Sequence, residues 1–151
     1  MKNRPILLVE DNDDDVRLTK RALKKNNITN QLIVVGDGIA ALDYLRDAAE
    51  PGDDQARVLP AVILLDLKLP KMDGMEVLRQ IREDPRLRRQ PVVVLTTSKE
   101  DQDILRSYDL GANSYICKPV DFEQFSAAIN HLGLYWLVLN EPPPEPAGSA
   151  S

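Results

Sequence analysis

The stretch Ala61-Val62-Ile63-Leu64-Leu65-Asp66 contains the most apolar run of the sequence and ends on a carboxylate. Five apolar residues in succession, without alternation, are typical of a strand that is buried on both sides in a parallel sheet. Similar short runs lie before and after it, and helical patterns separate them. This alternation predicts an α/β protein with a parallel sheet and helices on both of its faces.

Five strands and five helices are predicted outward from this stretch. The strands are expected at 6–9, 31–35, 61–65, 92–95 and 114–117. The helices are expected at about 14–26, 39–48, 74–82 and 100–110, and a long last helix begins at Asp121. The polar segment 50–60, which holds Pro51 and Gly52, is interpreted as a loop. Right-handed crossovers between parallel strands leave few possible topologies.

Length and composition indicate one acidic, globular domain. The chain has 151 residues, of which 43% are hydrophobic, and a net charge of −5, so a sizeable core is possible. We expect the domain to span 1–140 and a disordered, proline-rich tail to span 141–151. The acidic charge argues against a nucleic-acid surface, and the N-terminus resembles neither a signal peptide nor a membrane span. The single cysteine, Cys117, excludes an intramolecular disulfide and suits the cytoplasm.

Polar side chains stand directly after four of the five predicted strands. In an open parallel sheet these strand ends share one edge, where ligand sites form. Each residue alone is most simply a solvated strand end, but together they predict one crevice. The residues are Glu10, Asp11, Asp66, Thr96 and Lys118.

The three acids of this set predict a metal site and a phosphoryl acceptor. Clustered carboxylates repel one another unless a cation or a proton neutralises them, and Mg²⁺ takes one or two carboxylates while keeping waters or phosphate oxygens. Asp11 and Asp66 are predicted to bind the metal directly, and Glu10 through water. Asp66 is also the predicted nucleophile, because a carboxylate can form an acyl phosphate. Lys118 and Thr96 would then contact the phosphoryl oxygens.

These residues and their spacing resemble the receiver domain of two-component response regulators. The resemblance is carried by Glu10-Asp11, by Leu-Leu-Asp-Leu-x-Leu-Pro-x-x-Asp-Gly at 64–74, by Thr96, and by Lys118-Pro119. Thr96 lies 30 residues after Asp66, and Lys118 lies 22 residues after Thr96. The match covers residues 5 to about 133. The segment 50–60, the stretch 95–98 and the C-terminus further resemble the single-domain regulators that partner phytochrome-type histidine kinases.

The resemblance implies a flavodoxin-like fold with strand order 2-1-3-4-5 and three layers. It implies that a histidine kinase phosphorylates Asp66 in a reaction that depends on Mg²⁺, with Mn²⁺ as a substitute, and that Thr96 and Tyr115 form a switch. The backbone carbonyl of Lys68 would be a further metal ligand. Many receivers have a small or amide residue at this place, and the sequence leaves open whether the Lys68 ammonium shortens or lengthens the life of the acyl phosphate.

Three other interpretations fit the sequence less well. A calcium loop that starts at Asp11 would need Gly and Glu where Val16 and Ala22 stand, so the acids at 13–15 are expected to cap the first helix instead. A phosphatase of the haloacid-dehalogenase type needs a second aspartate two residues after its nucleophile, and Lys68 occupies that place. A degenerate receiver that only binds partners would not need the complete set of site residues.

The sequence therefore predicts a signalling switch that catalyses only its own phosphorylation and slow dephosphorylation. Glycine-rich nucleotide loops are absent from the sequence. His131, in the last helix, is expected to be an inert surface residue, and Cys117 a small buried one.

The predicted end of the last helix is apolar on several faces. Tyr135, Trp136, Leu137 and Val138 are consecutive, so their side chains spread around more than half of the helix, whereas the sheet can cover only one side. We expect a homodimer that buries them, and a tail that folds back over them is the alternative. No effector domain follows residue 140, so output is expected through an unidentified partner protein, a dimer change or onward phosphotransfer.

Overall fold

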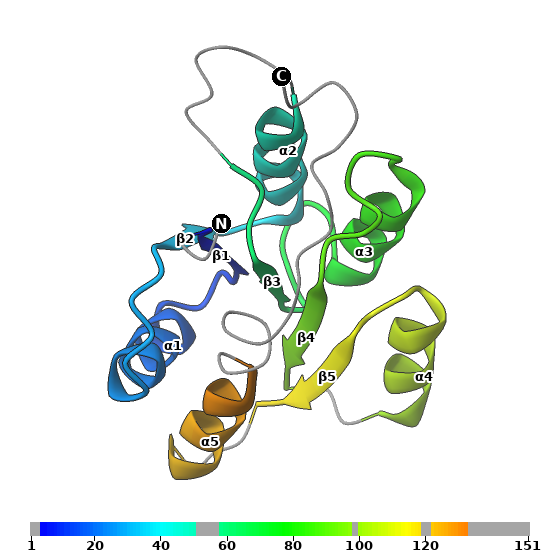
Figure 1. The fold of residues 1–151 in the computed structure, drawn as a ribbon. Helices are drawn as coiled ribbons and strands as arrows, with labels where there is room; N and C mark the ends of the chain where they lie inside the picture. Colours follow the sequence, from blue (N-terminus) through cyan, green and yellow to red (C-terminus); the bar gives the residue numbers. More distant parts are fainter. Residues whose placement is uncertain (1–3, 51–57, 98–99, 119–121, 133–151) are drawn as a thin grey trace.

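The computed structural model describes residues 4–50, 58–97, 100–118 and 122–132. Its five strands form one parallel sheet in the order β2-β1-β3-β4-β5 (Figure 1), which confirms the predicted strand order. The strands are β1 Ile6–Val9, β2 Leu32–Val35, β3 Val62–Leu65, β4 Val92–Thr96 and β5 Ser114–Cys117. The helices are α1 Asp13–Lys25, α2 Gly38–Ala49, α3 Gly74–Glu83, α4 Asp101–Asp109 and α5 Phe122–Leu132.

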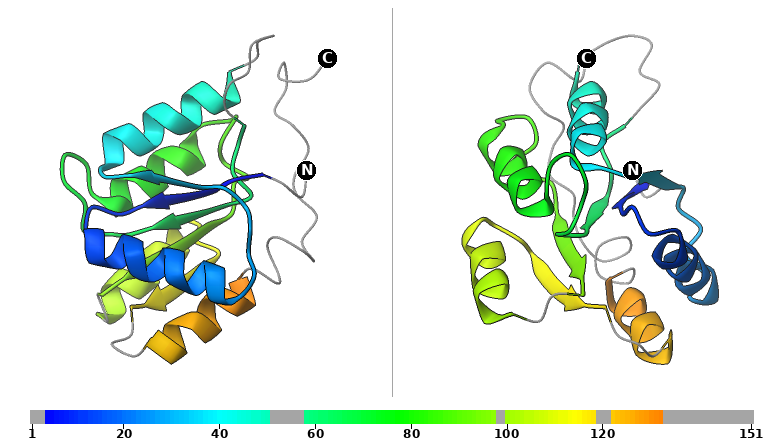
Figure 2. Two further views of the ribbon diagram at one scale, coloured as in Figure 1. Left: turned by 90° about the vertical axis from the view of Figure 1, so that its left-hand side faces the viewer. Right: turned by 180° about the vertical axis from the view of Figure 1, so that it is seen from behind.

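The sheet separates two hydrophobic cores, because successive residues of a strand point to opposite faces. In β3, Ile63 and Leu65 pack in the core that α2 and α3 cover, whereas Val62 and Leu64 pack in the core that α1 and α5 cover. The helix α4 lies on the same side as α2 and α3 (Figures 1 and 2). All four β3 side chains are buried. The apolar run at 62–65 therefore marks a central strand, as predicted.

The first helix begins differently from the prediction. Asn12 caps α1, because its side-chain oxygen accepts a hydrogen bond from the backbone N–H of Asp15 at 3.1 Å. The acids at 13–15 do not cap the helix but form its first turn, where the positive end of the helix dipole favours them. At the other end of the chain, the predicted dimer residues Tyr135, Trp136, Leu137 and Val138 and the tail 141–151 lie outside the described residues.

Gly74 allows the segment after β3 to fold tightly against the edge of the sheet. A Cβ at this position would lie 2.2 Å from the carbonyl oxygen of Asp66 and 2.6 Å from the Cα of Leu67. The Gly74 N–H donates to the Leu67 carbonyl at 2.8 Å, and the Asp73 carboxylate caps α3 by accepting from the Glu76 N–H at 3.0 Å. The start of α3 thus fixes the backbone on which the Asp66 side chain stands.

Candidate functional site

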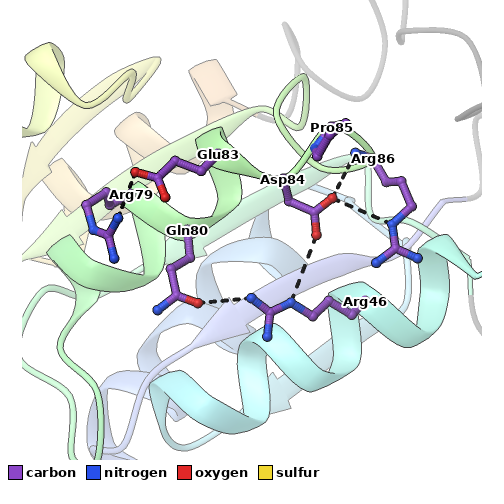
Figure 3. A pocket seen from close by; sticks show the side chains of 7 residues that line it. All are labelled: Arg46, Arg79, Gln80, Glu83, Asp84, Pro85 and Arg86. Carbon is purple, nitrogen blue, oxygen red and sulfur yellow. Dashed lines mark hydrogen bonds and ion pairs between the residues drawn. The ribbon is translucent and has the colours of Figure 1, made fainter.

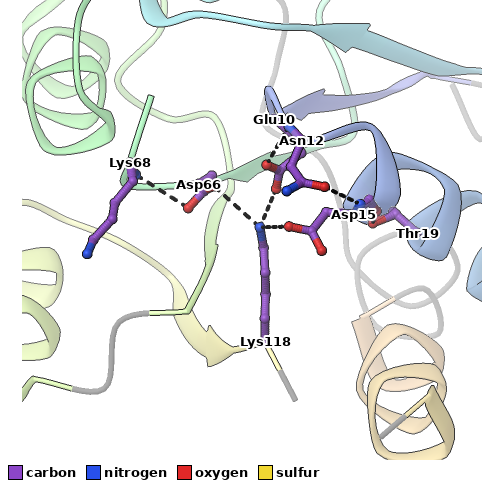
Figure 4. A network of polar contacts seen from close by, with 7 residues as sticks. All are labelled: Glu10, Asn12, Asp15, Thr19, Asp66, Lys68 and Lys118. Atoms are coloured by element: carbon purple, nitrogen blue, oxygen red, sulfur yellow. Dashed lines mark hydrogen bonds and ion pairs between the residues drawn. The ribbon is translucent and has the colours of Figure 1, made fainter. Parts of the chain in front are cut away.

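The strand register brings the predicted site residues to one edge of the sheet. The strands β1 and β3 end level with each other, since Val9 pairs with Leu65, and Glu10 and Asp66 therefore follow at neighbouring positions. Lys118 comes directly after β5 and reaches across to both of them (Figure 4). Residues more than 100 positions apart in the sequence thus meet at one edge of the sheet, as the sequence analysis expected, and this cluster of side chains around Lys118 is called the crevice below.

The Lys118 ammonium group is the centre of this crevice. Its Nζ lies 2.7 Å from Asp15 Oδ2 and 3.3 Å from Asp66 Oδ2, and it also donates a hydrogen bond to Glu10 Oε1. Only 8% of the Lys118 side chain is exposed. Three buried or half-buried carboxylates therefore share one ammonium, which has three N–H groups to give.

Burial has the largest single effect on the pKa values of Glu10 and Lys118. Glu10 is 3% exposed and Asp66 is 7% exposed. Burial raises the pKa of Glu10 to about 7, and it outweighs the opposite effect of the hydrogen bond and the charge of Lys118. Burial alone would lower the pKa of Lys118, but hydrogen bonds to Asp15 and Glu10 and the charge of Asp66 raise it overall. The crevice thus holds more negative charge than its lysine neutralises.

The acidic cluster fits a divalent cation. One carboxylate oxygen each from Glu10, Asp11 and Asp66 lie within 4.8 Å of one another. Asp11 is exposed while the other two acids are buried, so one side of the cluster is open to solvent. All three donors are carboxylate oxygens, which Mg²⁺ and Mn²⁺ prefer. The residues present therefore suit such an ion without any rearrangement of the fold.

Lys68 lies beside the crevice, but its charged group is not part of it. The Lys68 backbone N–H donates to Asp66 Oδ1 at 3.4 Å. Its side chain is exposed and points away from the carboxylates (Figure 4). The main chain of Lys68 is therefore close enough to orient Asp66, while the side chain extends towards solvent.

Thr96 and Tyr115 occupy neighbouring strands, at and near the same edge. Thr96 is the last residue of β4 and is fully buried, and its carbonyl accepts a hydrogen bond from the Lys118 N–H at 2.7 Å. Tyr115 lies in β5, is half-buried and packs against the core on the α2 and α3 side. Their roles in a switch stay predictions.

Asp15 is the site residue that the sequence analysis missed. Asp15 follows the five polar residues 10–14, so the sequence favours a role in helix capping, yet its carboxylate contacts Lys118. Two minor predictions have different outcomes. His131 is exposed in the last turn of α5, as expected. Cys117 is half-buried rather than buried, because β5 is an edge strand.

A depression lies between α2 and the end of α3 (Figure 3). Arg46, Arg79 and Arg86 line it. Arg46 donates to Gln80 at 2.9 Å, Arg79 pairs with Glu83 at 2.7 Å, and Arg86 pairs with Asp84 at 3.6 Å. Because each arginine already has a partner, this surface does not offer a free positive charge to an anionic ligand.

Comparison with known proteins identifies the family. The profile of the response regulator receiver domain matches residues 6–130. The chain belongs to the response regulator receiver family. This receiver is 47% identical over 138 residues to the probable methanogenesis regulatory protein FilR2 of Methanothrix harundinacea, which covers 91% of this chain and 86% of FilR2. It is 42% identical over 132 residues to the response regulator Rcp1 of Synechocystis, which covers 87% of this chain and 88% of Rcp1.

Solved structures of receivers have the same fold. The phosphorylated cyanobacterial phytochrome response regulator RcpA is similar with a TM-score of 0.83 at 42% identity, over 94% of this chain and 99% of RcpA. The Mn²⁺-bound form of Rcp1 is similar with a TM-score of 0.81 at 40% identity, over 93% and 99%. Receivers are signalling proteins that partner with sensor histidine kinases. Within the described ranges, no helix is long and apolar enough to cross a membrane.

Proposed function

We propose that Asp66 accepts a phosphoryl group from a sensor histidine kinase and that this receiver works as a reversible signalling switch. The observation that supports it most is the buried Asp66 carboxylate, which lies 3.3 Å from the Lys118 ammonium and has an oxygen within 4.8 Å of carboxylate oxygens of Glu10 and Asp11. An Asp66 oxygen bonds to phosphorus as the bond between phosphorus and the donor histidine nitrogen breaks. Later attack of water on phosphorus returns the carboxylate and releases inorganic phosphate.

The other residues of the crevice have supporting roles in this proposal. Asp11, Asp66 and the backbone carbonyl of Lys68 would hold Mg²⁺ or Mn²⁺, and Glu10 would contact it through water. The ion would supply positive charge that neutralises the phosphoryl group. Lys118 neutralises further charge, and the hydroxyl of Thr96 donates to a phosphoryl oxygen. Phosphoryl transfer needs this positioning and neutralisation more than covalent help. Movement of Thr96 then opens space for Tyr115, which reports the phosphorylated state.

Phosphorylation by a small donor tests the proposed function directly. The full chain is incubated with acetyl phosphate and Mg²⁺, and intact mass spectrometry follows the product. We expect one added phosphoryl group that appears only with a divalent ion and disappears over time once the donor is removed. A chain that stays unlabelled at every Mg²⁺ concentration contradicts the proposal.

Removal of Asp11 is expected to abolish the response of stability to Mg²⁺. An ion that binds only the folded state stabilises it by mass action, by about 2.7 kcal/mol at 100 times the dissociation constant. The melting temperature of the wild type should therefore rise by several degrees with Mg²⁺, and that of Asp11→Ala should not. Without the ion, Asp11→Ala should be as stable as the wild type or more stable, because it relieves repulsion between carboxylates. Thermal unfolding with and without Mg²⁺ measures both effects.

Asp13→Ala is the matched control for this experiment. Asp13 is an exposed acid two residues further on, and it is not a member of the carboxylate cluster. Its removal takes away the same charge and costs at most a small dipole interaction at the start of α1. Its Mg²⁺ response should equal that of the wild type. An equal Mg²⁺ response in Asp11→Ala would argue against the metal site.

We infer that the kinase partner is of the phytochrome type and that the receiver acts in the cytoplasm. The similarity to RcpA, which is a phytochrome response regulator by name, supports this partner. FilR2, at 47% identity, is named for the regulation of methanogenesis, so an input signal other than light is the alternative. Phosphoryl transfer to this chain from a purified phytochrome-type kinase, compared in red light and in darkness, distinguishes these two input signals.

We also propose that the chain is a homodimer that buries Tyr135, Trp136, Leu137 and Val138. Full burial of each large apolar side chain would stabilise the dimer by roughly 1.5–3 kcal/mol. Sedimentation of the full chain should give twice the 16.9 kDa of one protomer, and deletion of residues 134–151 should give the monomer. A full chain that sediments as a monomer, phosphorylated or not, would refute the dimer.

A further inference from the structure

Lys118 has no N–H group left for a phosphoryl oxygen in this structure. Its three N–H groups face three carboxylates, and the distance to Asp15 is 2.7 Å whereas that to Asp66 is 3.3 Å. A phosphoryl group on Asp66 would need at least one of these N–H groups. Lys118 must then give up one of its present partners.

The backbone of Asp15 is held in place by contacts within its own helix. Its backbone N–H donates to the Asn12 side chain at 3.1 Å, and its carbonyl accepts from the buried Thr19 hydroxyl at 2.8 Å. Its side chain is 29% exposed. The next acid, Asp14, is 85% exposed and pairs with Arg17 on the surface. Of these two adjacent aspartates in one helical turn, Asp15 contacts Lys118, whereas Asp14 is more exposed and pairs with Arg17 instead.

We propose that Asp15 is a positioning residue that holds Lys118 partly away from Asp66 until phosphorylation, when the ammonium exchanges Asp15 for a phosphoryl oxygen. This inference rests on the proposed function of Asp66. Of the three carboxylates, Asp15 is the partner that Lys118 can release most readily, because it is the most exposed and water can replace the ammonium. Release of Glu10 would leave a buried carboxylate without its cation, which is far more costly.

Asp15→Asn is expected to have opposite effects on the binding of Mg²⁺ and on the binding of a phosphoryl group at Asp66. Asp15→Asn keeps the shape of the side chain but removes its charge, so Lys118 moves closer to Asp66, from which it now lies 3.3 Å away. A phosphoryl group on Asp66 then binds more tightly, because the Lys118 ammonium is no longer held by the Asp15 carboxylate. Mg²⁺ binds more weakly, because Lys118 now competes more strongly for the same carboxylates. A residue that only stabilises the fold, or one that binds the metal itself, would instead weaken both ligands when it is replaced.

The test uses Mg²⁺ alone and beryllofluoride, a small anion that mimics a phosphoryl group on a carboxylate. Calorimetry gives the dissociation constant of Mg²⁺, and NMR spectra of the full chain at saturating Mg²⁺ give the half-saturating concentration of beryllofluoride. For Asp15→Asn we expect the Mg²⁺ dissociation constant to rise about fivefold and the beryllofluoride concentration to fall about fivefold, the low end of coupling between linked sites. Asp14→Asn should equal the wild type in both, and Asp15→Glu, which retains the charge, should lie closer to the wild type than Asp15→Asn.

Each outcome decides the inference. Weaker binding of both ligands by Asp15→Asn assigns Asp15 to the fold or to the metal and overturns it, and so does a result equal to that of Asp14→Asn. Labelling of the wild type by acetyl phosphate is measured in the same series. If the wild type neither labels nor binds beryllofluoride, the proposed function of Asp66 fails, which is distinct from a failure of Asp15 alone.

Discussion

Asp66→Asn is expected to take no phosphoryl group from acetyl phosphate under conditions in which the wild type takes one. The amide oxygen of Asn is not a nucleophile, whereas a carboxylate oxygen can form an acyl phosphate. The fold should persist because the two side chains are nearly the same size. In the wild type Asp66 Oδ1 only accepts a hydrogen bond, from the Lys68 N–H at 3.4 Å, and an amide oxygen can accept it as well. Intact mass spectrometry after a fixed incubation measures the loss.

The control for this substitution is Asp73→Asn, in the same loop. Asp73 is exposed and caps α3, a position that Asn fills about as well as Asp. It should label at the wild-type rate. Near-ultraviolet circular dichroism shows whether each variant keeps its tertiary packing. Labelling of Asp66→Asn at the wild-type rate would mean that another residue is the acceptor.

The fold and the shared strand edge were predictable because burial requires apolar residues at particular positions of the sequence. A parallel strand covered on both faces must be apolar at every position, so 62–65 identified β3 and placed Asp66 at its end. Once all strands are parallel, their carboxyl ends lie at the same edge. The meeting of Glu10, Asp66 and Lys118 then follows from topology, and no knowledge of side-chain positions is needed.

Asp15 could not be found in this way, because its role depends on where two elements sit relative to each other. Capping preferences for Asn and Asp are nearly equal, so the sequence did not show that Asn12 caps α1 and leaves Asp15 in the first turn. Whether Asp15 or Asp14 faces Lys118 depends on the rotation of α1 against the end of β5. That rotation is set by the packing of α1 against α5, including the contact of Arg21 with the Phe122 ring at 4.1 Å. Neither Asp14 nor Asp15 stands near Lys118 in the sequence.

Lys118→Ala is expected to destabilise the protein most strongly at high pH without Mg²⁺. Removal of one partner from a buried charge cluster leaves the other charges uncompensated, which costs about 3 kcal/mol or more. The pH dependence follows from Glu10, whose pKa rises from 4.5 to about 7 because it is buried. The folded protein holds this proton more tightly than the unfolded chain does, so stability falls as the pH rises from 4.5 towards 7. Without Lys118, the free energy of unfolding should continue to fall to higher pH.

Urea unfolding of the wild type and of Lys118→Ala at pH 5.5 and pH 8 tests this expectation, with Lys25→Ala as the matched lysine control. Lys25 is about half exposed and pairs with Glu123 at 2.8 Å, and such surface pairs contribute ~1 kcal/mol or less. The difference between wild type and Lys118→Ala should widen from pH 5.5 to pH 8 and narrow again with Mg²⁺, because the ion then supplies the positive charge that the ammonium supplied. Labelling by acetyl phosphate should be slower but still detectable, since the nucleophile is intact. A loss of stability that is the same at both pH values and insensitive to Mg²⁺ would mean that Lys118 only fills space, and the Asp15 exchange would then have no charge to act on.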